Sequence, residues 1–72
     1  MPDTRLQCLT PVAAQAVAAE ADKPERNHRA IADGSAVVLT YFDKRYPLDV
    51  AEWAFDNGHC DDSAAGDVIA RL

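Results

Sequence analysis

The segment AVVLTYF at residues 36–42 says more about the fold than any other part of this sequence. Its β-branched and aromatic residues favour an extended strand, and they are apolar at successive positions, as in a strand covered on both faces. Asp33-Gly34 lies just before it and is a strong signal for a two-residue hairpin turn, because both turn positions favour positive φ. The sequence therefore predicts a hairpin, with 36–42 as the central strand of a sheet.

A weaker turn signal at Asp43-Lys44 leads into residues 45–48, which we interpret as the third strand, and Pro47 suggests a strand at the sheet edge. Pairing across the two turns places Ile31 opposite Ala36 and Tyr41 opposite Tyr46. The predicted core face carries Ala30, Val37, Leu39, Tyr41, Tyr46 and Leu48. The opposite face carries Arg29, Val38, Thr40, Phe42 and Arg45. A slip of one residue would exchange the two faces.

Residues 1–9 read as a short lead-in that can be extended near Leu6 and Leu9, and a first helix is expected to follow. Thr10 is suited to cap the free backbone N–H groups, and Pro11 is suited to the first helical position. This helix is predicted to reach about Lys23, because the residue before Pro24 avoids the helical region.

Two further helices are expected near the end of the chain. One is predicted to begin at Asp49, with Glu52 as a reciprocal cap, and to end where Gly58 adopts the left-handed conformation. The last is predicted over about 63–71, capped by Asp62 or Ser63. The order α-β-β-β-α-α predicts one small α+β domain over 1–72, in which helices pack on one face of a three-stranded antiparallel sheet.

The apolar core available to such a domain is thin. The chain has 72 residues, of which 14 are alanine and only 18 are large apolar side chains. A single core in a chain of this size contributes only about 3–5 kcal/mol, and many such chains gain stability from a partner or a second copy. A protein partner is therefore expected, with a homodimer as the alternative.

Charge is distributed unevenly along the sequence. Residues 1–48 hold six acidic and six basic side chains, whereas residues 49–72 hold six acidic side chains against Arg71 alone. The net charge of −5 therefore arises in the last third of the chain, where it would attract a basic surface. This negative charge argues against direct nucleic acid binding, which needs clustered Lys and Arg. Base stacking on the polar sheet face, through Arg29, Arg45 and Phe42, is a weak alternative.

The acidic side chains of the second expected helix form a stripe. At 100° per residue, Asp49, Glu52 and Asp56 fall within an arc of about 60°. A solvated helix face explains this stripe, and an interface with a basic surface is the functional alternative. The apolar residues of the helix are spread too widely for one sheet to cover, so an aromatic beside the carboxylates is expected to be partly exposed and to act as a hot spot. The predicted partner-binding residues are Asp49, Glu52, Trp53, Phe55, Asp56, Asp61 and Asp62.

Metal, cofactor and catalytic motifs are not expected to contribute. His59 and Cys60 are adjacent, whereas zinc ligands are usually paired at short spacing, so no metal or cofactor is predicted. Cys8 and Cys60 are expected to be free thiols, with a disulfide between them as the less favoured alternative. The sequence has no phosphate-binding loop or nucleophile motif. A domain of this size also leaves little room for a substrate pocket of about 300 Å³. The protein is therefore not expected to be an enzyme.

These observations favour a cytoplasmic protein that acts by binding. No secretory signal and no apolar run of about 20 residues is found, so neither export nor a membrane span is expected. In size, acidity and lack of motifs the chain is similar in style to small phage and mobile-element inhibitors such as anti-CRISPR proteins, which suggests occlusion of a basic, nucleic-acid-binding surface on a larger protein. The alternative is a homo-oligomeric structural or adaptor subunit that uses apolar surface around Trp53 and Phe55.

Overall fold

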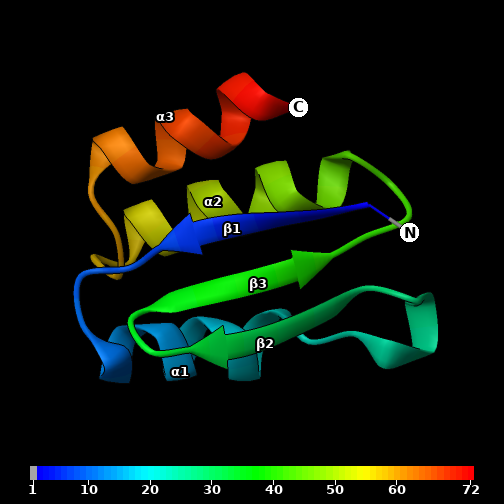
Figure 1. Cartoon of the computed structure of the whole chain (residues 1–72), viewed down its shortest axis with the longest axis horizontal. Coiled ribbons are helices and arrows are strands. Elements are labelled where there is room, and N and C mark those ends of the chain that lie inside the picture. The colour runs from blue at the N-terminus through cyan, green and yellow to red at the C-terminus, as the bar shows by residue number, and fades with distance from the viewer. Residues whose placement is uncertain (1) are drawn as a thin grey trace.

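The computed structural model describes residues 2–72, in which three helices pack on a three-stranded antiparallel sheet (Figure 1). The predicted α+β class and the antiparallel sheet are confirmed. The strands, in the spatial order β1-β3-β2, are β1 (Asp3–Gln7), β2 (Arg29–Asp33) and β3 (Ala36–Thr40). The helices are α1 (Pro11–Ala21), α2 (Arg45–Asp56) and α3 (Asp62–Arg71), and a 3₁₀ turn, η1 (Pro24–Arg26), lies between α1 and β2.

The predicted hairpin forms, but its turn lies one residue later than expected. Asp33 pairs with Ala36, so the loop residues are Gly34 and Ser35 and not Asp33 and Gly34. Gly34 has φ 62° and Ser35 does not have positive φ, as in a turn with glycine at its first central position. Ile31 consequently pairs with Val38 and not with Ala36. A shift of two residues keeps each side chain on its side of the sheet, so the predicted faces of the hairpin hold.

The third strand is β1, and the prediction of a strand at 45–48 is wrong. β1 pairs with β3, with Leu6 opposite Val37 and Thr4 opposite Leu39. Leu6 and Thr4 are buried and their neighbours in β1 are exposed, which is the alternation of a strand with one covered face. The segment that we interpreted as a lead-in therefore completes the sheet.

Residues 45–48 form the first turn of α2, and the predicted helix start at Asp49 is too late. The Asp43 carboxylate accepts a hydrogen bond from the Arg45 backbone N–H at 2.9 Å, and Pro47 lies in the first turn, where a helix needs no N–H donor. Tyr46 does not pair with Tyr41. Its hydroxyl donates to the carbonyl oxygen of Ala21 at 2.7 Å, which ties α2 to the end of α1.

The helix ends use the expected chemistry, with one change of residue. Thr10 Oγ1 accepts from the Ala13 N–H at 3.0 Å, and α1 ends at Ala21, slightly before the predicted Lys23. Gly58 follows α2 with φ 75°, as predicted. The two hydrogen bonds typical of a left-handed cap are present, from the Gly58 N–H to the Phe55 carbonyl oxygen and from the His59 N–H to the Ala54 carbonyl oxygen. Asp61 caps α3, in place of the predicted Asp62 or Ser63, by accepting from Ala64 N–H at 2.8 Å.

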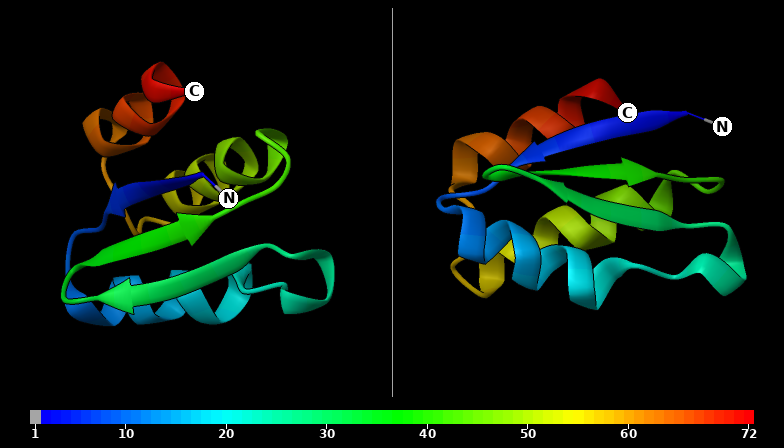
Figure 2. Two further views of the ribbon diagram at one scale, coloured as in Figure 1. Left: turned by 45° about the vertical axis from the view of Figure 1, so that its right-hand side comes forward. Right: turned by 60° about the horizontal axis from the view of Figure 1, so that its bottom comes forward.

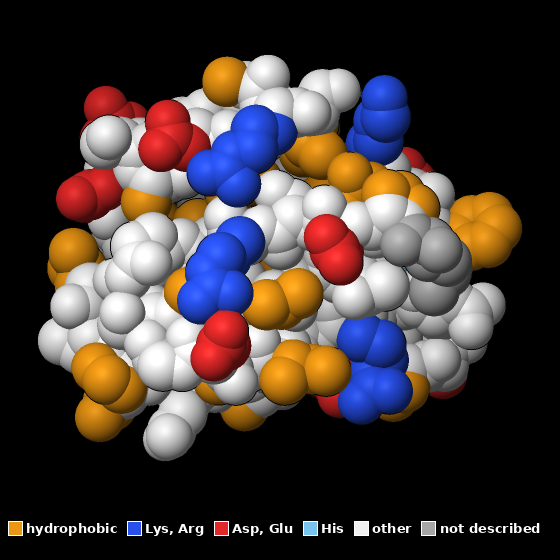
Figure 3. Space-filling view, in the orientation of Figure 1, with side chains coloured by type: hydrophobic (Ala, Val, Ile, Leu, Met, Phe, Trp, Pro, Cys, Tyr) orange, Lys and Arg blue, Asp and Glu red, His pale blue; other side chains and the backbone are white. Residues whose placement is uncertain are grey.

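The helices lie on one side of the sheet. α1 and α2 cover one face, and α3 continues this layer beyond β1 (Figure 2). The opposite face carries no helix and shows interspersed basic, acidic and apolar side chains (Figure 3). Within residues 2–72, no helix has both the length and the apolar character needed to cross a membrane. The fully buried side chains of the core include Leu6, Ala14, Val17, Val37, Leu39, Ala51, Ala54 and Val68.

Small side chains allow α1 to lie close to the sheet, which makes the helix sensitive to added volume. Ala14 is fully buried on the sheet-facing side of α1, and Ala19 is exposed. We expect Ala14→Leu to lower the free energy of unfolding by about 1–3 kcal/mol, because a close-packed core cannot take up three extra carbons without strain. Ala19→Leu, the matched control, should change it by less than about 0.5 kcal/mol. Urea denaturation measures both, and equal effects would contradict the packing described for α1.

Candidate functional site: an acidic ridge on α2 and the pocket beside it

The predicted acidic stripe lies on the solvent side of α2. The core side of this helix is formed by Pro47, Val50, Ala51 and Ala54. At 100° per residue, Asp49, Glu52 and Asp56 point in the opposite direction, and all three are exposed. We call these three residues the acidic ridge. It extends over about 10 Å of helix, at 1.5 Å per residue.

The carboxylates of the acidic ridge take part in no ion pair within the described residues. In the part of the chain that the structure describes, ion pairs join Arg5 to Asp33 at 2.9 Å and Arg29 to Asp22 at 2.8 Å. Both pairs lie within residues 1–48, whose net charge is zero in the sequence. The charge asymmetry of the sequence thus becomes an asymmetry of the folded surface, with unpaired negative charge on α2.

The two aromatic residues beside the ridge differ in their surroundings. Phe55 is 45% exposed on one flank. Trp53, on the other flank, is half-buried, and its ring lies 5.3 Å from the ring of His59. The expectation that one of them would be partly exposed is confirmed, and Phe55 is the more accessible.

The remaining two predicted site residues follow α2 in the chain. Asp61 is exposed, but one of its carboxylate oxygens caps α3, so it has a structural role as well. Asp62 is exposed in the first turn of α3, where a negative charge favours the helix dipole. Both carboxylates add negative charge near the end of α2 but make no contact with the acidic ridge among the hydrogen bonds and ion pairs described for residues 2–72.

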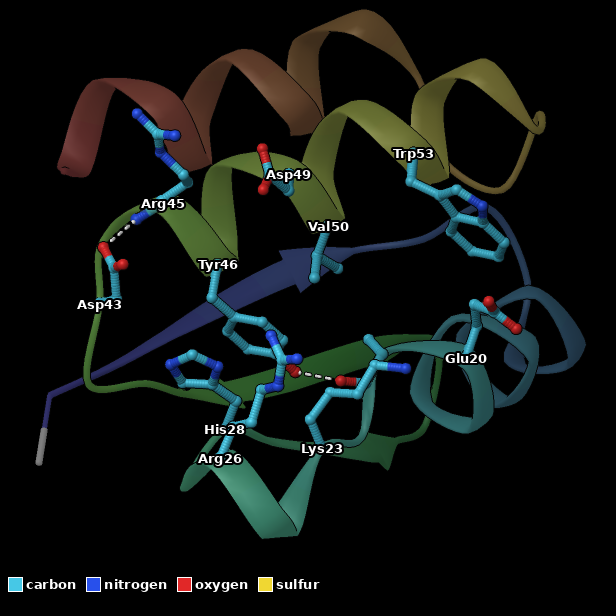
Figure 4. A pocket seen from close by; sticks show the side chains of 11 residues that line it. Glu20, Lys23, Arg26, His28, Asp43, Arg45, Tyr46, Asp49, Val50 and Trp53 are labelled. Atoms are coloured by element: carbon cyan, nitrogen blue, oxygen red, sulfur yellow. Dashed lines mark hydrogen bonds between the residues drawn. The ribbon is translucent and has the colours of Figure 1, made fainter.

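A pocket of about 360 Å³ lies between the end of α1, η1 and α2 (Figure 4). The expectation that so small a domain would have little room for a pocket is therefore wrong. Alanine-rich α1 does not fill the space between the two helices, while Tyr46 and Trp53 of α2 form part of its wall. The charged lining residues are Glu20, Lys23, Arg26, Asp43, Arg45 and Asp49, and the remaining ones are Ala21, His28, Tyr46, Val50 and Trp53.

Tyr46 is fixed at the base of this pocket. Its ring stacks on His28 with 4.4 Å between the ring centres and 14° between the planes. Burial, with a smaller effect of the Asp22 charge, raises the pKa of Tyr46 to about 12. The hydroxyl therefore remains protonated at physiological pH and acts as the hydrogen-bond donor to Ala21, which argues for a structural role and against general base chemistry.

The cluster His59-Cys60-Asp61-Asp62 does not converge on a metal. His59 packs against Trp53, Cys60 is buried in the core, and Asp61 caps α3. Throughout residues 2–72, the structure shows no group of three or more His, Cys, Asp or Glu side chains placed to hold a metal ion.

Cys8 and Cys60 are both buried and both free. Their backbone segments are adjacent, since the Leu9 N–H donates to the His59 carbonyl oxygen at 2.9 Å. Burial raises the pKa of the Cys8 thiol, and burial raises the pKa of Cys60 to about 11, with smaller effects of Cys8 and Asp61. Both side chains are therefore neutral thiols at physiological pH.

We expect both thiols to be unreactive in the folded protein. At pH 8 a disulfide reagent such as Ellman's reagent should modify them roughly 100-fold more slowly than in 6 M guanidinium chloride, because the reactive thiolate is scarce and both sulfurs are shielded. The measurement is the rate of absorbance change under the two conditions. Rapid modification of either thiol in the native protein would contradict the burial described for them.

The pocket residues from α1 and η1 were not identified from the sequence. Helical periodicity located the acidic ridge and Trp53, but Glu20, Lys23 and Arg26 carry no local signal for a site. They meet α2 where the Tyr46 hydroxyl bonds to the carbonyl oxygen of Ala21, 25 residues away in the sequence.

Comparisons with known proteins give no guide to function. No protein-family model, no curated protein and no solved structure matches the chain. We therefore infer the function from the acidic ridge and its surroundings.

Proposed function

We propose that the protein is a small cytoplasmic inhibitor that covers a basic, nucleic-acid-binding surface of a larger protein or complex, as anti-CRISPR and related phage or mobile-element proteins do. The observation that carries this proposal is the acidic ridge. Asp49, Glu52 and Asp56 are exposed on one side of α2, with no basic side chain of the described chain in an ion pair with them.

The row of charges on the ridge supports binding to a surface that otherwise holds nucleic acid. Asp49 and Glu52 are about 4.5 Å apart along the helix axis, and Glu52 and Asp56 are about 6 Å apart. Phosphates along one strand of B-DNA are about 3.4 Å apart on the helix axis. A row of Lys and Arg arranged for a phosphate backbone would therefore find a row of negative charges on α2, at a wider spacing than in DNA.

Charge alone is not expected to give high affinity. An exposed ion pair contributes about 0.2–1 kcal/mol, while aromatic residues at the centre of an interface contribute more. Phe55 is 45% exposed beside the ridge and is suited to that role. The ridge would then speed association and orient the complex, and Phe55 would slow its dissociation.

Capture from a host lysate tests the proposal. The wild-type protein and the variant Glu52→Lys/Asp56→Lys are immobilised separately, exposed to lysate at low salt and eluted with a salt gradient, and the eluted proteins are identified by mass spectrometry. We expect a nucleic-acid-processing protein that elutes at moderate salt from the wild-type column only, and addition of the wild-type protein should block its nucleic acid binding. The same proteins on both columns, or no loss of nucleic acid binding, would contradict the proposal.

A homo-oligomeric structural or adaptor subunit is the second candidate, favoured by the exposure of Phe55 and by Phe42, which is 75% exposed. Sedimentation velocity at high protein concentration distinguishes it. If it is right, the protein self-associates to the same extent in 0.1 M and 1 M salt, and Phe55→Ala or Trp53→Ala disrupts the assembly. A monomer under both conditions excludes it.

A further inference from the structure

We infer that the pocket between α1 and α2 binds an arginine side chain, at the end formed by Glu20 and Trp53. This inference rests on the proposed function, because the basic surface of the partner would supply the arginine. It deepens that function by assigning one pocket on this chain to one type of side chain on the partner.

The first argument is electrostatic. Glu20 lies in the last turn of α1, where the helix dipole is negative, and that turn contains no basic residue. A negative side chain at this position is unfavourable unless a cation is nearby. Glu20 is exposed and has no ion-pair partner among the described residues, although Lys23 lines the same pocket. The Glu20 carboxylate is therefore available to pair with a cation from the partner.

The second argument is the aromatic surface at the same end of the pocket as Glu20. Trp53 is the single tryptophan of the chain, and it lines the pocket while half-buried, so its ring is held in place but remains accessible. Tryptophan is the best aromatic partner for a cation above its ring. Arginine suits the site better than lysine, because its planar and weakly hydrated guanidinium stacks on aromatic rings and bonds carboxylates through two N–H groups.

The third argument is the charge of the opposite end, which would fix the position of the guest. Figure 4 shows Glu20 and Trp53 at one end of the pocket and His28 and Arg45 at the other. Lys23 and Arg26 line the pocket between these two ends. Lys23, Arg26 and Arg45 take part in no ion pair within the described chain, so they repel a cation from the middle of the pocket and from the end at Arg45. A guanidinium is thereby restricted to the region of Glu20 and Trp53.

Titration of isotope-labelled protein with blocked amino acids, followed by NMR, tests this inference. The probes are N-acetyl-arginine amide, the lysine equivalent, and the citrulline equivalent, which has nearly the shape of arginine but no charge. The indole N–H signal of Trp53 is the readout, and it is unambiguous because the chain has one tryptophan. We expect a saturable shift with arginine at millimolar concentration, a weaker one with lysine and none with citrulline.

Two variants locate the binding to this end of the pocket. Glu20→Gln should weaken arginine binding by about 1.5- to fivefold, the range expected for loss of one exposed ion pair. Glu25→Gln is the matched control, since Glu25 is exposed in η1 but does not line the pocket, and it should have no effect. Equal shifts with arginine and citrulline, or equal affinities of the two variants, would overturn the inference.

The outcome can be separated from that of the proposed function. The variant Glu52→Lys/Asp56→Lys leaves every residue of the pocket unchanged. If this variant loses the captured partner while the wild-type pocket ignores arginine, the inference fails and the proposed function stands. If arginine binds the pocket while the variant retains the same partners as the wild type, the proposed function fails and the pocket remains an arginine site.

Discussion

Replacing Leu39 with alanine should leave a large fraction of the protein unfolded at 25 °C. Leu39 is fully buried in β3, the central strand of the sheet, between Thr4 of β1 and Ala30 of β2. Truncation of a buried leucine to alanine costs about 2–5 kcal/mol, through lost burial and the cavity that remains. The core of a chain this small contributes only about 3–5 kcal/mol to stability, so most of the reserve is removed.

The control for this prediction lies on the other face of the same sheet. Ile31 in β2 is 56% exposed on the side that no helix covers. Ile31→Ala should therefore lower the free energy of unfolding by less than about 1 kcal/mol. Urea denaturation followed by the fluorescence of Trp53 measures both variants. A comparable loss from Ile31→Ala and Leu39→Ala would show that the two sheet faces are assigned wrongly.

Reversing two charges of the acidic ridge should weaken binding to the partner roughly 10- to 150-fold in 0.1 M salt. Each substitution in Glu52→Lys/Asp56→Lys replaces an attraction with a repulsion, and two such changes amount to about 1.5–3 kcal/mol. Both side chains point away from the core, so the fold should be retained. Isothermal titration calorimetry with the purified partner gives the affinity, and circular dichroism checks the fold.

A second double variant separates a local effect from one of net charge. Asp3→Lys/Glu25→Lys changes the net charge from −5 to −1, as the ridge variant does, but alters exposed residues of β1 and η1. We expect it to reduce affinity by less than about threefold, since distant exposed charges are screened within about 10 Å at 0.1 M salt. Equal losses from the two variants would mean that total charge, and not the ridge on α2, drives association.

Local chemistry was sufficient to predict the β2–β3 hairpin, α1 and the end of α2. Asp33-Gly34 marks the turn to within one residue, Thr10-Pro11 marks a helix start, and Gly58 marks a helix end. Each of these features depends on backbone conformation or capping within a few residues, which is why sequence patterns report them.

The exchange of strands shows where local patterns fail. The Arg45-Tyr46-Pro47-Leu48 segment is compatible with an edge strand and with a first helical turn. Its helical conformation is stabilised by a hydrogen bond from Tyr46 to Ala21, 25 residues away, which no local rule can supply. β1 was missed for a related reason. Its five residues include only one large apolar side chain, Leu6, so the local sequence gives little signal for a strand. They form a strand because β3 is available to pair with them.

The candidate site divides in the same way. The acidic ridge follows from the helical repeat of α2 and was predicted even though the helix start was wrong, because a repeat of 3.6 residues does not depend on where the helix begins. The pocket combines residues 20–28 with residues 43–53, two segments that are separated along the sequence. Only the packing of α2 on the end of α1 brings them together.

The salt dependence of the dissociation constant of the wild-type complex tests most directly whether the acidic ridge drives binding. The measurement is calorimetry with the purified partner between 0.1 M and 1 M salt, over which the Debye length falls from about 10 Å to about 3 Å. We expect the dissociation constant to rise at least tenfold over this range. A dissociation constant that stays the same would contradict an electrostatic interface and show that apolar surface holds the partner.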